Sequence, residues 1–154
     1  MTKKHMVGSL ALATLAFERG VSTLAQQIGF ERELDAVVAA ARARGTLTNP
    51  VVRDRLVETW IGLRLLRFNA LRTMSSEGEP GPEASISKLA WATWHRGLGR
   101  LAADVLGPSI ELPEHEHLRR LFLFTAADTI YGGSNEIQRN LLGERVLGLP
   151  KGPA

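Results

Sequence analysis

The sequence predicts an all-α fold, an up-down four-helix bundle with a short additional helix near the C-terminus. Apolar residues recur at helical spacing along several segments, and no stretch alternates apolar and polar residues as a strand would. Short stretches rich in glycine and proline separate the segments, as between antiparallel helices. The chain has 154 residues, 44% of them hydrophobic and 23% charged, which is enough for one domain with a hydrophobic core.

The first predicted helix runs from residue 7 to residue 44 and is rich in Ala and Leu. Gly20 and Gly29 weaken it locally, and the stretch GTLTNP ends it. Because such a helix is long for a lone globular domain, we expect it either to break near Gly29 or to project toward a partner. Residues 1–6, MTKKHM, are polar and unpatterned, and we interpret them as a tag or a disordered start.

The next two predicted helices are separated by the strongest loop signal of the chain. One helix covers about 51–74, with Pro50 near its first turn, where proline is favoured. The stretch SSEGEPGPEAS, residues 75–85, has the glycines and prolines of a loop. A helix over about 82–106 follows it.

The C-terminal part is predicted to hold two shorter helices. The stretch GPSIELPEHEH is irregular, and a short helix over about 114–129 follows it. The last helix covers 134–147. We therefore expect one helical domain over 7–149 and a tail at 150–154.

The composition of the chain indicates which kinds of partner and which cellular compartment to expect. The net charge is +3, but the basic residues alternate with Glu and Asp, so we predict no nucleic-acid partner. The sequence contains no run of eighteen apolar residues, so we predict no membrane span. Cysteine is absent, which excludes disulfides and thiolate metal sites. We expect a cytoplasmic protein.

The histidines do not form a recognisable metal-binding pattern. His115 and His117 lie two residues apart, which suits neither one face of a helix nor a zinc pair with further ligands. His95 is distant from both in the sequence. We predict no metal site.

A flexible joint precedes the last predicted helix. Gly132 and Gly133 are followed by Ser134 and Asn135, which are good helix N-caps, and Gln138 stands three residues after Asn135 as in a capping box. One interpretation is a well-capped helix after a turn. The other is that backbone N–H groups at the helix start bind a polar or anionic ligand, with glycine allowing close approach. The local pattern by itself favours the first.

The stretch IYGGSNEIQRNLLGERVLGLP resembles the C-terminal signature of the acyl-CoA dehydrogenases, Tyr-Glu-Gly-Thr-Ser/Asn-x-Ile-Gln-Arg followed by a helix. The matching residues are Tyr131, Gly133, Ser134, Ile137, Gln138 and Arg139. The helical pattern of the whole chain agrees with the C-terminal bundle domain of that family. The resemblance implies an FAD-dependent enzyme that removes an α-proton and a β-hydride from an acyl-CoA thioester.

The sequence departs from the signature at Gly132, where many members have the glutamate that acts as the base. Some members, isovaleryl-CoA dehydrogenases among them, carry the base on the first long helix of this domain, followed directly by Arg. Glu18 and Arg19, in TLAFERG, stand at the matching place. The resemblance therefore implies that Glu18 is the catalytic base and that Arg19 is its electrostatic neighbour.

The helical spacing around Glu18 leaves two interpretations open. Glu18 falls on an apolar face of the predicted helix that includes Phe17, Val21 and Ile28, where desolvation would disfavour its charged form, as suits a base. Alternatively, Glu18 pairs with a basic residue and only holds the bundle together.

The resemblance also implies which residues lie near cofactor and substrate. It places Ser134, Asn135, Glu136 and Gln138 at the FAD, and Tyr131, Gly132 and Gly133 at the acyl-CoA substrate.

Family members are about twice as long as this chain, with an N-terminal helical domain and a middle β-domain. Two stretches that contact flavin in the family are replaced here by RARGTLTNPVVRDRL and DVLGPSIEL. We therefore expect the isolated chain neither to bind FAD nor to be active alone.

Because family bundles assemble into oligomers, we expect a homo-oligomer or a hetero-oligomer formed through the bundle. The alternative function is a non-catalytic helical subunit that assembles with another acyl-CoA dehydrogenase chain.

Overall fold

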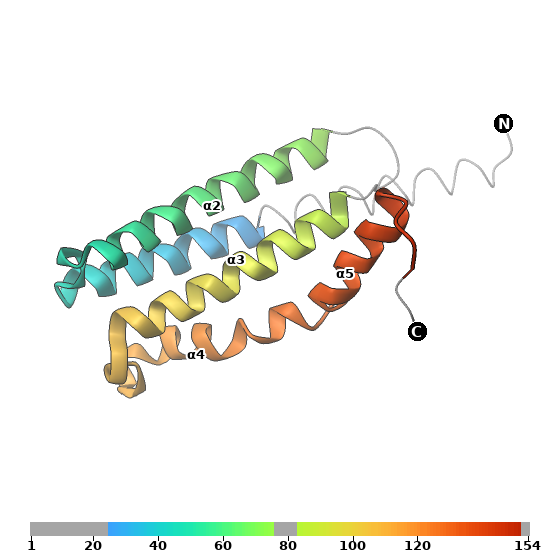
Figure 1. Cartoon of the computed structure of the whole chain (residues 1–154). Coiled ribbons are helices and arrows are strands. Elements are labelled where there is room, and N and C mark those ends of the chain that lie inside the picture. The colour runs from blue at the N-terminus through green and yellow to red at the C-terminus, as the bar shows by residue number, and fades with distance from the viewer. Residues whose placement is uncertain (1–24, 76–82, 152–154) are drawn as a thin grey trace, which may run out of the picture.

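The computed structural model describes residues 25–75 and 83–151, and every regular element in these ranges is a helix (Figure 1). The first helix covers 25–43 of the described part. The elements that follow it are η1 (Thr46–Thr48), α2 (Pro50–Ser75), α3 (Glu83–Leu106), η2 (Gly107–Glu111), η3 (Pro113–His115), α4 (Glu116–Phe124), η4 (Ala127–Thr129), α5 (Asn135–Leu141) and η5 (Leu142–Val146). The predicted all-α fold is confirmed.

The long helices run up and down beside one another (Figure 1). The first helix and α2 are antiparallel neighbours, and α3 returns alongside them. Two shorter helices, α4 and α5, together take the fourth position of the bundle, with a bend between them. Both pack on α3. None of the helices within the described residues is long and apolar enough to cross a membrane.

Helix α2 begins where the sequence predicts it. The Asn49 side chain accepts a hydrogen bond from the Val51 N–H at 2.9 Å, which satisfies one of the free donors at the helix start. Pro50 is the first residue of the helix, where its missing N–H costs nothing.

The first helix is continuous across Gly29, so of the two alternatives expected for it, the break near this glycine is wrong. Phe30 and Leu34, on the C-terminal side of Gly29, are buried against the bundle. Burial of these side chains outweighs the roughly 1 kcal/mol by which glycine weakens a helix. Ile28, predicted on an apolar face, is 54% exposed. It lies on the side of the helix opposite to Phe30 and Leu34. Glu18 and Arg19 lie outside the described residues.

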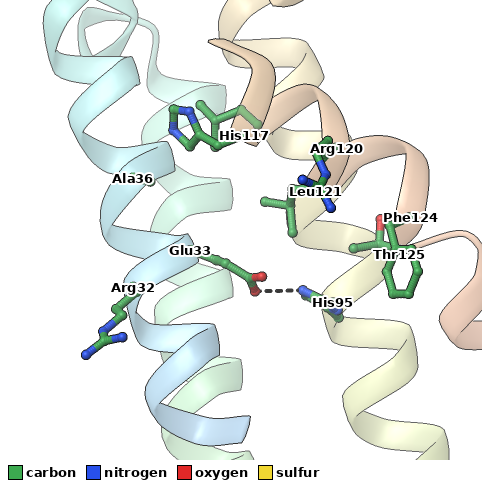
Figure 2. A pocket seen from close by; sticks show the side chains of 10 residues that line it. Arg32, Glu33, Ala36, His95, His117, Arg120, Leu121, Phe124 and Thr125 are labelled. Carbon is green, nitrogen blue, oxygen red and sulfur yellow. Dashed lines mark hydrogen bonds and ion pairs between the residues drawn. The ribbon is translucent and has the colours of Figure 1, made fainter. Parts of the chain in front are cut away.

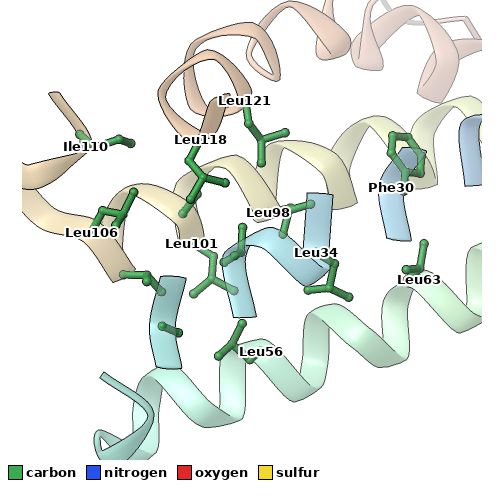
Figure 3. Packing of buried hydrophobic residues seen from close by; sticks show 14 residues of the cluster. Phe30, Leu34, Leu56, Leu63, Leu98, Leu101, Leu106, Ile110, Leu118 and Leu121 are labelled. Carbon is green, nitrogen blue, oxygen red and sulfur yellow. The ribbon is translucent and has the colours of Figure 1, made fainter. Parts of the chain in front are cut away.

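The hydrophobic core lies between the first helix, α2, α3 and α4 (Figure 3). Leu98, Leu101 and Leu106 of α3 are at most 1% exposed, which makes α3 the central helix. The side chains that complete the cluster around them come from all the neighbours: Phe30, Leu34, Val37, Ala41, Leu56, Leu63, Ala102, Val105, Ile110, Leu118 and Leu121.

The two C-terminal helices are shorter than predicted. The predicted helix over 114–129 is α-helical only from Glu116 to Phe124. After it, the chain turns inward and buries Thr125 and Asp128, each 1% exposed, so a straight helix cannot continue there. The last helix, α5, changes to a π-helical turn, η5, after Leu141.

Glycines of α2 and α3 allow neighbouring helices to approach closely. A Cβ atom at Gly62 would lie 2.6 Å from the Trp94 ring, whose indole N–H donates to the Thr59 carbonyl at 2.8 Å. A Cβ atom at Gly99 would overlap Thr125 Oγ1 and lie 3.2 Å from the Leu121 carbonyl oxygen. Since the Leu121 oxygen is backbone, it cannot move aside without shifting α4.

We predict that Gly99→Ala destabilises the protein by about 1–3 kcal/mol, because the added methyl overpacks the α3–α4 contact. The matched control is Gly97→Ala in the same helix, where an added Cβ meets nothing within 4 Å. The control should gain about 0.5–1 kcal/mol from helix propensity. Urea denaturation measures both, and equal effects of the two substitutions would contradict the close contact.

Candidate functional site

The predicted joint between α4 and α5 is a tight turn with two left-handed glycines. Gly132 has φ 66° and Gly133 has φ 94°, values that residues with a Cβ atom rarely adopt. A Cβ atom at Gly133 would lie 2.6 Å from Gln138 Nε2, whereas one at Gly132 would make ordinary contact with Lys88 Cε at 3.7 Å. Glycine is required at 133 by both conformation and space.

Ser134 is the N-cap of α5, as predicted, and its hydroxyl oxygen accepts from the Ile137 N–H at 3.4 Å. The predicted capping box between Asn135 and Gln138 does not form, because the helix starts one residue earlier than that arrangement requires. The Gln138 side chain instead donates to the Gly132 carbonyl at 3.3 Å, which closes the turn. Asn135 points inward, and its Nδ2 lies 3.4 Å from Thr93 Oγ1 on α3.

Glu136 is directed to solvent at the first turn of α5. Its carboxylate lies 3.7 Å from the Arg139 guanidinium, and both side chains are more than half exposed. Its own backbone N–H and the Ser134 hydroxyl lower the pKa of the Glu136 carboxyl, and Arg139 adds a smaller effect in the same direction.

Tyr131 anchors the turn to a buried carboxylate. Its hydroxyl donates to Asp128 Oδ1 at 2.6 Å, and its ring lies between those of Trp91 and Phe124, with centroids 6.3 and 6.4 Å away. Burial, with the hydrogen bond and charge of Asp128, raises the pKa of Tyr131 to about 12. The hydroxyl therefore stays protonated and keeps donating.

Lys88 covers the inner side of the same turn. Its ammonium donates to the Asp128 carbonyl and lies 5.2 Å from the centre of the Trp91 ring and 5.8 Å from that of Tyr131. Burial lowers the pKa of Lys88, and the negative charge of Asp128 opposes this effect.

His95 joins this region to the first helix. Its Nδ1 lies 2.6 Å from Asp128 Oδ2, and its Nε2 lies 2.7 Å from Glu33 Oε2. His95 and Asp128 are buried, whereas the Glu33 side chain is 38% exposed. Glu33 reaches His95 across a pocket of about 450 Å³ between the first helix and α4, which His117, Arg120 and Phe124 also line (Figure 2).

The structure thus gathers Tyr131, Gly132, Gly133, Ser134 and Gln138 in one turn. Asn135 and Glu136 follow in α5, with one side chain facing inward and the other outward.

Sequence analysis missed Lys88, Asp128 and Glu33, and treated His95 only as a possible metal ligand. A signal was present, because Lys88, Trp91 and His95 are spaced to lie on one face of a helix. No group of three potential metal ligands occurs among the described residues.

Comparison with known proteins identifies the family. The model of the acyl-CoA dehydrogenase C-terminal domain matches residues 8–147. The chain belongs to the acyl-CoA dehydrogenase family.

Curated relatives support the same family. The chain is 54% identical over 147 residues to the acyl-CoA dehydrogenase IpdE1 of Mycobacterium tuberculosis, a match covering 92% of this chain and 38% of the relative. It is 52% identical over 145 residues to IpdE1 of Mycolicibacterium smegmatis, covering 92% of this chain and 36% of the relative. The chain thus spans less than two fifths of the length of these relatives.

The fold also resembles solved structures of the family. A structure described as the Tcur3481-Tcur3483 steroid ACAD matches with a TM-score of 0.74 at 24% identity, covering 87% of this chain and 38% of that one. Its G363A variant matches with the same TM-score at 25% identity, covering 94% of this chain and 40% of that one.

The acyl-CoA dehydrogenase family uses FAD, and one feature of the joint suits part of such a cofactor. The side-chain oxygen of Asn135 is buried and has no hydrogen-bond partner among the described residues. A buried acceptor of this kind is costly unless a donor reaches it. A hydroxyl or ring N–H of a flavin is a donor of the kind that this oxygen lacks.

We predict that Gly133→Ala destabilises this acyl-CoA dehydrogenase domain by about 0.5–1.5 kcal/mol more than Gly132→Ala, because the added Cβ atom would displace the Gln138 amide from its hydrogen bond to the Gly132 carbonyl. Both substitutions place a Cβ atom at positive φ, but only the Cβ atom at position 133 would press on the Gln138 amide. Thermal denaturation of the two variants gives the comparison. Equal stability of the two would show that Gln138 does not close the turn.

Proposed function

We propose that the chain is the C-terminal domain of an FAD-dependent acyl-CoA dehydrogenase that introduces an α,β double bond into an acyl-CoA thioester, with Glu18 as the base. The observation that carries the proposal is the family match over residues 8–147, together with 54% identity to an acyl-CoA dehydrogenase. Because the chain spans less than two fifths of that relative, we expect activity only in the full-length protein.

The described joint offers no free carboxylate, which supports a base from elsewhere. Gly132 has no side chain at the position where many members place the base. Asp128 is 1% exposed and accepts hydrogen bonds from Tyr131 and His95. Glu136 is directed to solvent beside Arg139.

The position of the first helix is compatible with a base at Glu18. Phe30, near the start of its described part, packs against Trp91, and Trp91 packs against Tyr131 of the joint. The chain therefore enters the described bundle at the same end as the joint. Glu18 precedes this point in the sequence, and Arg19 would provide a positive neighbour for its charged form.

In this proposal each part of the joint has a separate task. Gly132 and Gly133 let the backbone approach the thioester, whose carbonyl needs hydrogen-bond donors when the α-proton leaves. Tyr131 and Gln138 hold the turn rigid. Ser134, Asn135 and Glu136 lie toward the cofactor. When bound, FAD would supply a hydride acceptor for the β-carbon.

The description of similar solved structures supports a proposal for the substrate class. The similar solved structure is described as a steroid ACAD, so we propose an acyl-CoA with a steroid-derived acyl group rather than a simple fatty acid. The cytoplasmic location expected from the sequence is part of the same proposal.

Glu18→Gln in the full-length protein should lower kcat by about 10²–10⁴-fold, the usual contribution of a general base. Flavin absorbance should stay unchanged, because the substitution removes a proton acceptor and not the cofactor site. Steady-state kinetics with a steroid acyl-CoA measures the effect.

The matched control for this test is Glu31→Gln in the described part of the first helix, because the Glu31 carboxylate contacts Arg64 at 3.3 Å and its loss should not affect kcat. A Glu18→Gln variant with unchanged kcat would exclude Glu18 as the base.

A second candidate function is a non-catalytic subunit that assembles with another acyl-CoA dehydrogenase chain. Helix α2 favours an assembly of some kind, because it carries large exposed apolar side chains in addition to those of its buried face. The exposed residues of this apolar surface, each at least 45% exposed, are Val57, Trp60, Ile61, Leu65, Phe68, Leu71 and Met74. An exposed surface of this size is typical of a protein interface.

Phe68→Glu should dissociate the assembly, because a charge would be buried among apolar side chains at the interface. Leu112→Glu is the control, since Leu112 is also exposed but lies between η2 and η3, away from α2. Sedimentation velocity of the full-length protein measures the change. An unchanged mass for Phe68→Glu would contradict an interface on α2.

A further inference from the structure

A cluster of hydrogen-bonded side chains, with His95 and Asp128 buried at its centre, joins three separate segments near the joint. His95 of α3 contacts Glu33 of the first helix at 2.7 Å and Asp128 of η4 at 2.6 Å, one carboxylate on each ring nitrogen. The other oxygen of Asp128 accepts from the Tyr131 hydroxyl at 2.6 Å. Glu33, His95, Asp128 and Tyr131 therefore form one chain of hydrogen bonds that ends next to Gly132.

The geometry favours the protonated form of His95. A neutral imidazole carries one N–H and can donate to only one carboxylate, whereas an imidazolium donates to both. The imidazolium is also the form that balances charge, because two carboxylates face one His95 and the Lys88 ammonium. Loss of the His95 proton would leave one N–H for two carboxylates, so either Glu33 or Asp128 would lose its donor.

Because of where the cluster lies, the protonation state of His95 affects how firmly the turn is held. Asp128 is held by His95 on one side, and on the other it holds Tyr131, the residue before Gly132. Lys88 fixes the carbonyl of the same residue, Asp128. If His95 becomes neutral, its single N–H can serve only one of the two carboxylates, so the chain of hydrogen bonds from Glu33 to Asp128 breaks at one end and the tie between the turn and the first helix weakens.

We propose that His95 is a positioning residue: as an imidazolium between Glu33 and Asp128, it holds the Tyr131–Ser134 turn against the first helix, and loss of its proton releases the turn. The effect on catalysis rests on the proposed function, because it requires the turn to be part of the active site. The effect on the turn itself does not depend on the proposed function.

The direction of the pH dependence follows from the groups that face His95. Burial by itself would lower the pKa of His95, but the hydrogen bonds and charges of Glu33 and Asp128 outweigh it and raise the pKa above the usual 6.5. The turn is therefore held fully at pH values below 6.5, the usual pKa of histidine. It is released as the pH rises through the raised pKa of His95. Other titratable or charged groups around the cluster and its pocket are Arg32, Lys88, His117, Arg120 and Tyr131.

Hydrogen–deuterium exchange of the full-length protein, read by mass spectrometry on peptides covering 126–136, tests the proposal at pH values from below to above 6.5. After correction for the intrinsic dependence of exchange on pH, protection of the turn should fall at least about tenfold through the His95 transition, as expected when a hydrogen bond to a charged group is lost. The pH profile of kcat should fall with the same midpoint.

Two variants make the test specific. His95→Gln should show low protection at every pH and no transition. Glu33→Gln removes one of the two charges that stabilise the imidazolium but leaves an acceptor, so the transition should move to lower pH. His117→Gln is the matched control, because this exposed histidine lines the same pocket, and it should behave as the wild type.

Each outcome bears on the proposal. Wild-type protection that does not change with pH, or a Glu33→Gln transition that does not move, would overturn it. The Glu33→Gln result decides the matter if His95→Gln fails to fold, since Glu33 is partly exposed. If the wild type binds no flavin and has no dehydrogenase activity, the proposed function fails, but the exchange data still decide whether His95 holds the turn.

Discussion

The central position of α3 is the constraint on which the rest of the structure depends. A helix packed against the first helix, α2, α4 and α5 must present small or apolar side chains on most of its circumference. Leu98, Leu101 and Leu106 do so toward the core, and Gly99 lets the backbone of α4 come into direct contact. With α4 held this close, the chain after it must turn sharply, and the turn places Asp128 in the interior.

Burial of Asp128 then determines the polar interactions at this end of the bundle. An isolated carboxylate in such a place would be costly, and every donor around it compensates for its desolvation. His95 and Tyr131 donate to its two oxygens, and Lys88 donates to its carbonyl. The same contacts hold the Gly132–Gly133 turn in place. The stability of the fold and the shape of the candidate site therefore rest on the same few side chains.

The surfaces left uncovered agree with a domain that works as part of a larger assembly. Helix α2 carries exposed apolar side chains in addition to those that face the core of the described bundle. The side chain of Ile28 likewise points away from the bundle. Exposed apolar surfaces of this kind are typical of protein interfaces, and the chain spans less than two fifths of the length of its curated relatives.

Local pattern in the sequence was sufficient to predict the helices, the start of α2 at Pro50, the Ser134 N-cap and the glycine turn, because spacing and capping act over a few residues. The resemblance of the last segment was sufficient to predict the family. The sequence was misleading where tertiary packing competes with propensity, as at Gly29, where burial of Phe30 and Leu34 keeps the helix continuous.

The sequence by itself thus determined the class of fold, the family and the position of the joint. Only the tertiary structure decided what holds the joint. Glu33, His95 and Asp128 are widely separated in the chain, and no local rule brings them together. Their contact exists because the first helix, α3 and the turn after α4 pack around one core, and that packing depends on all the side chains at once.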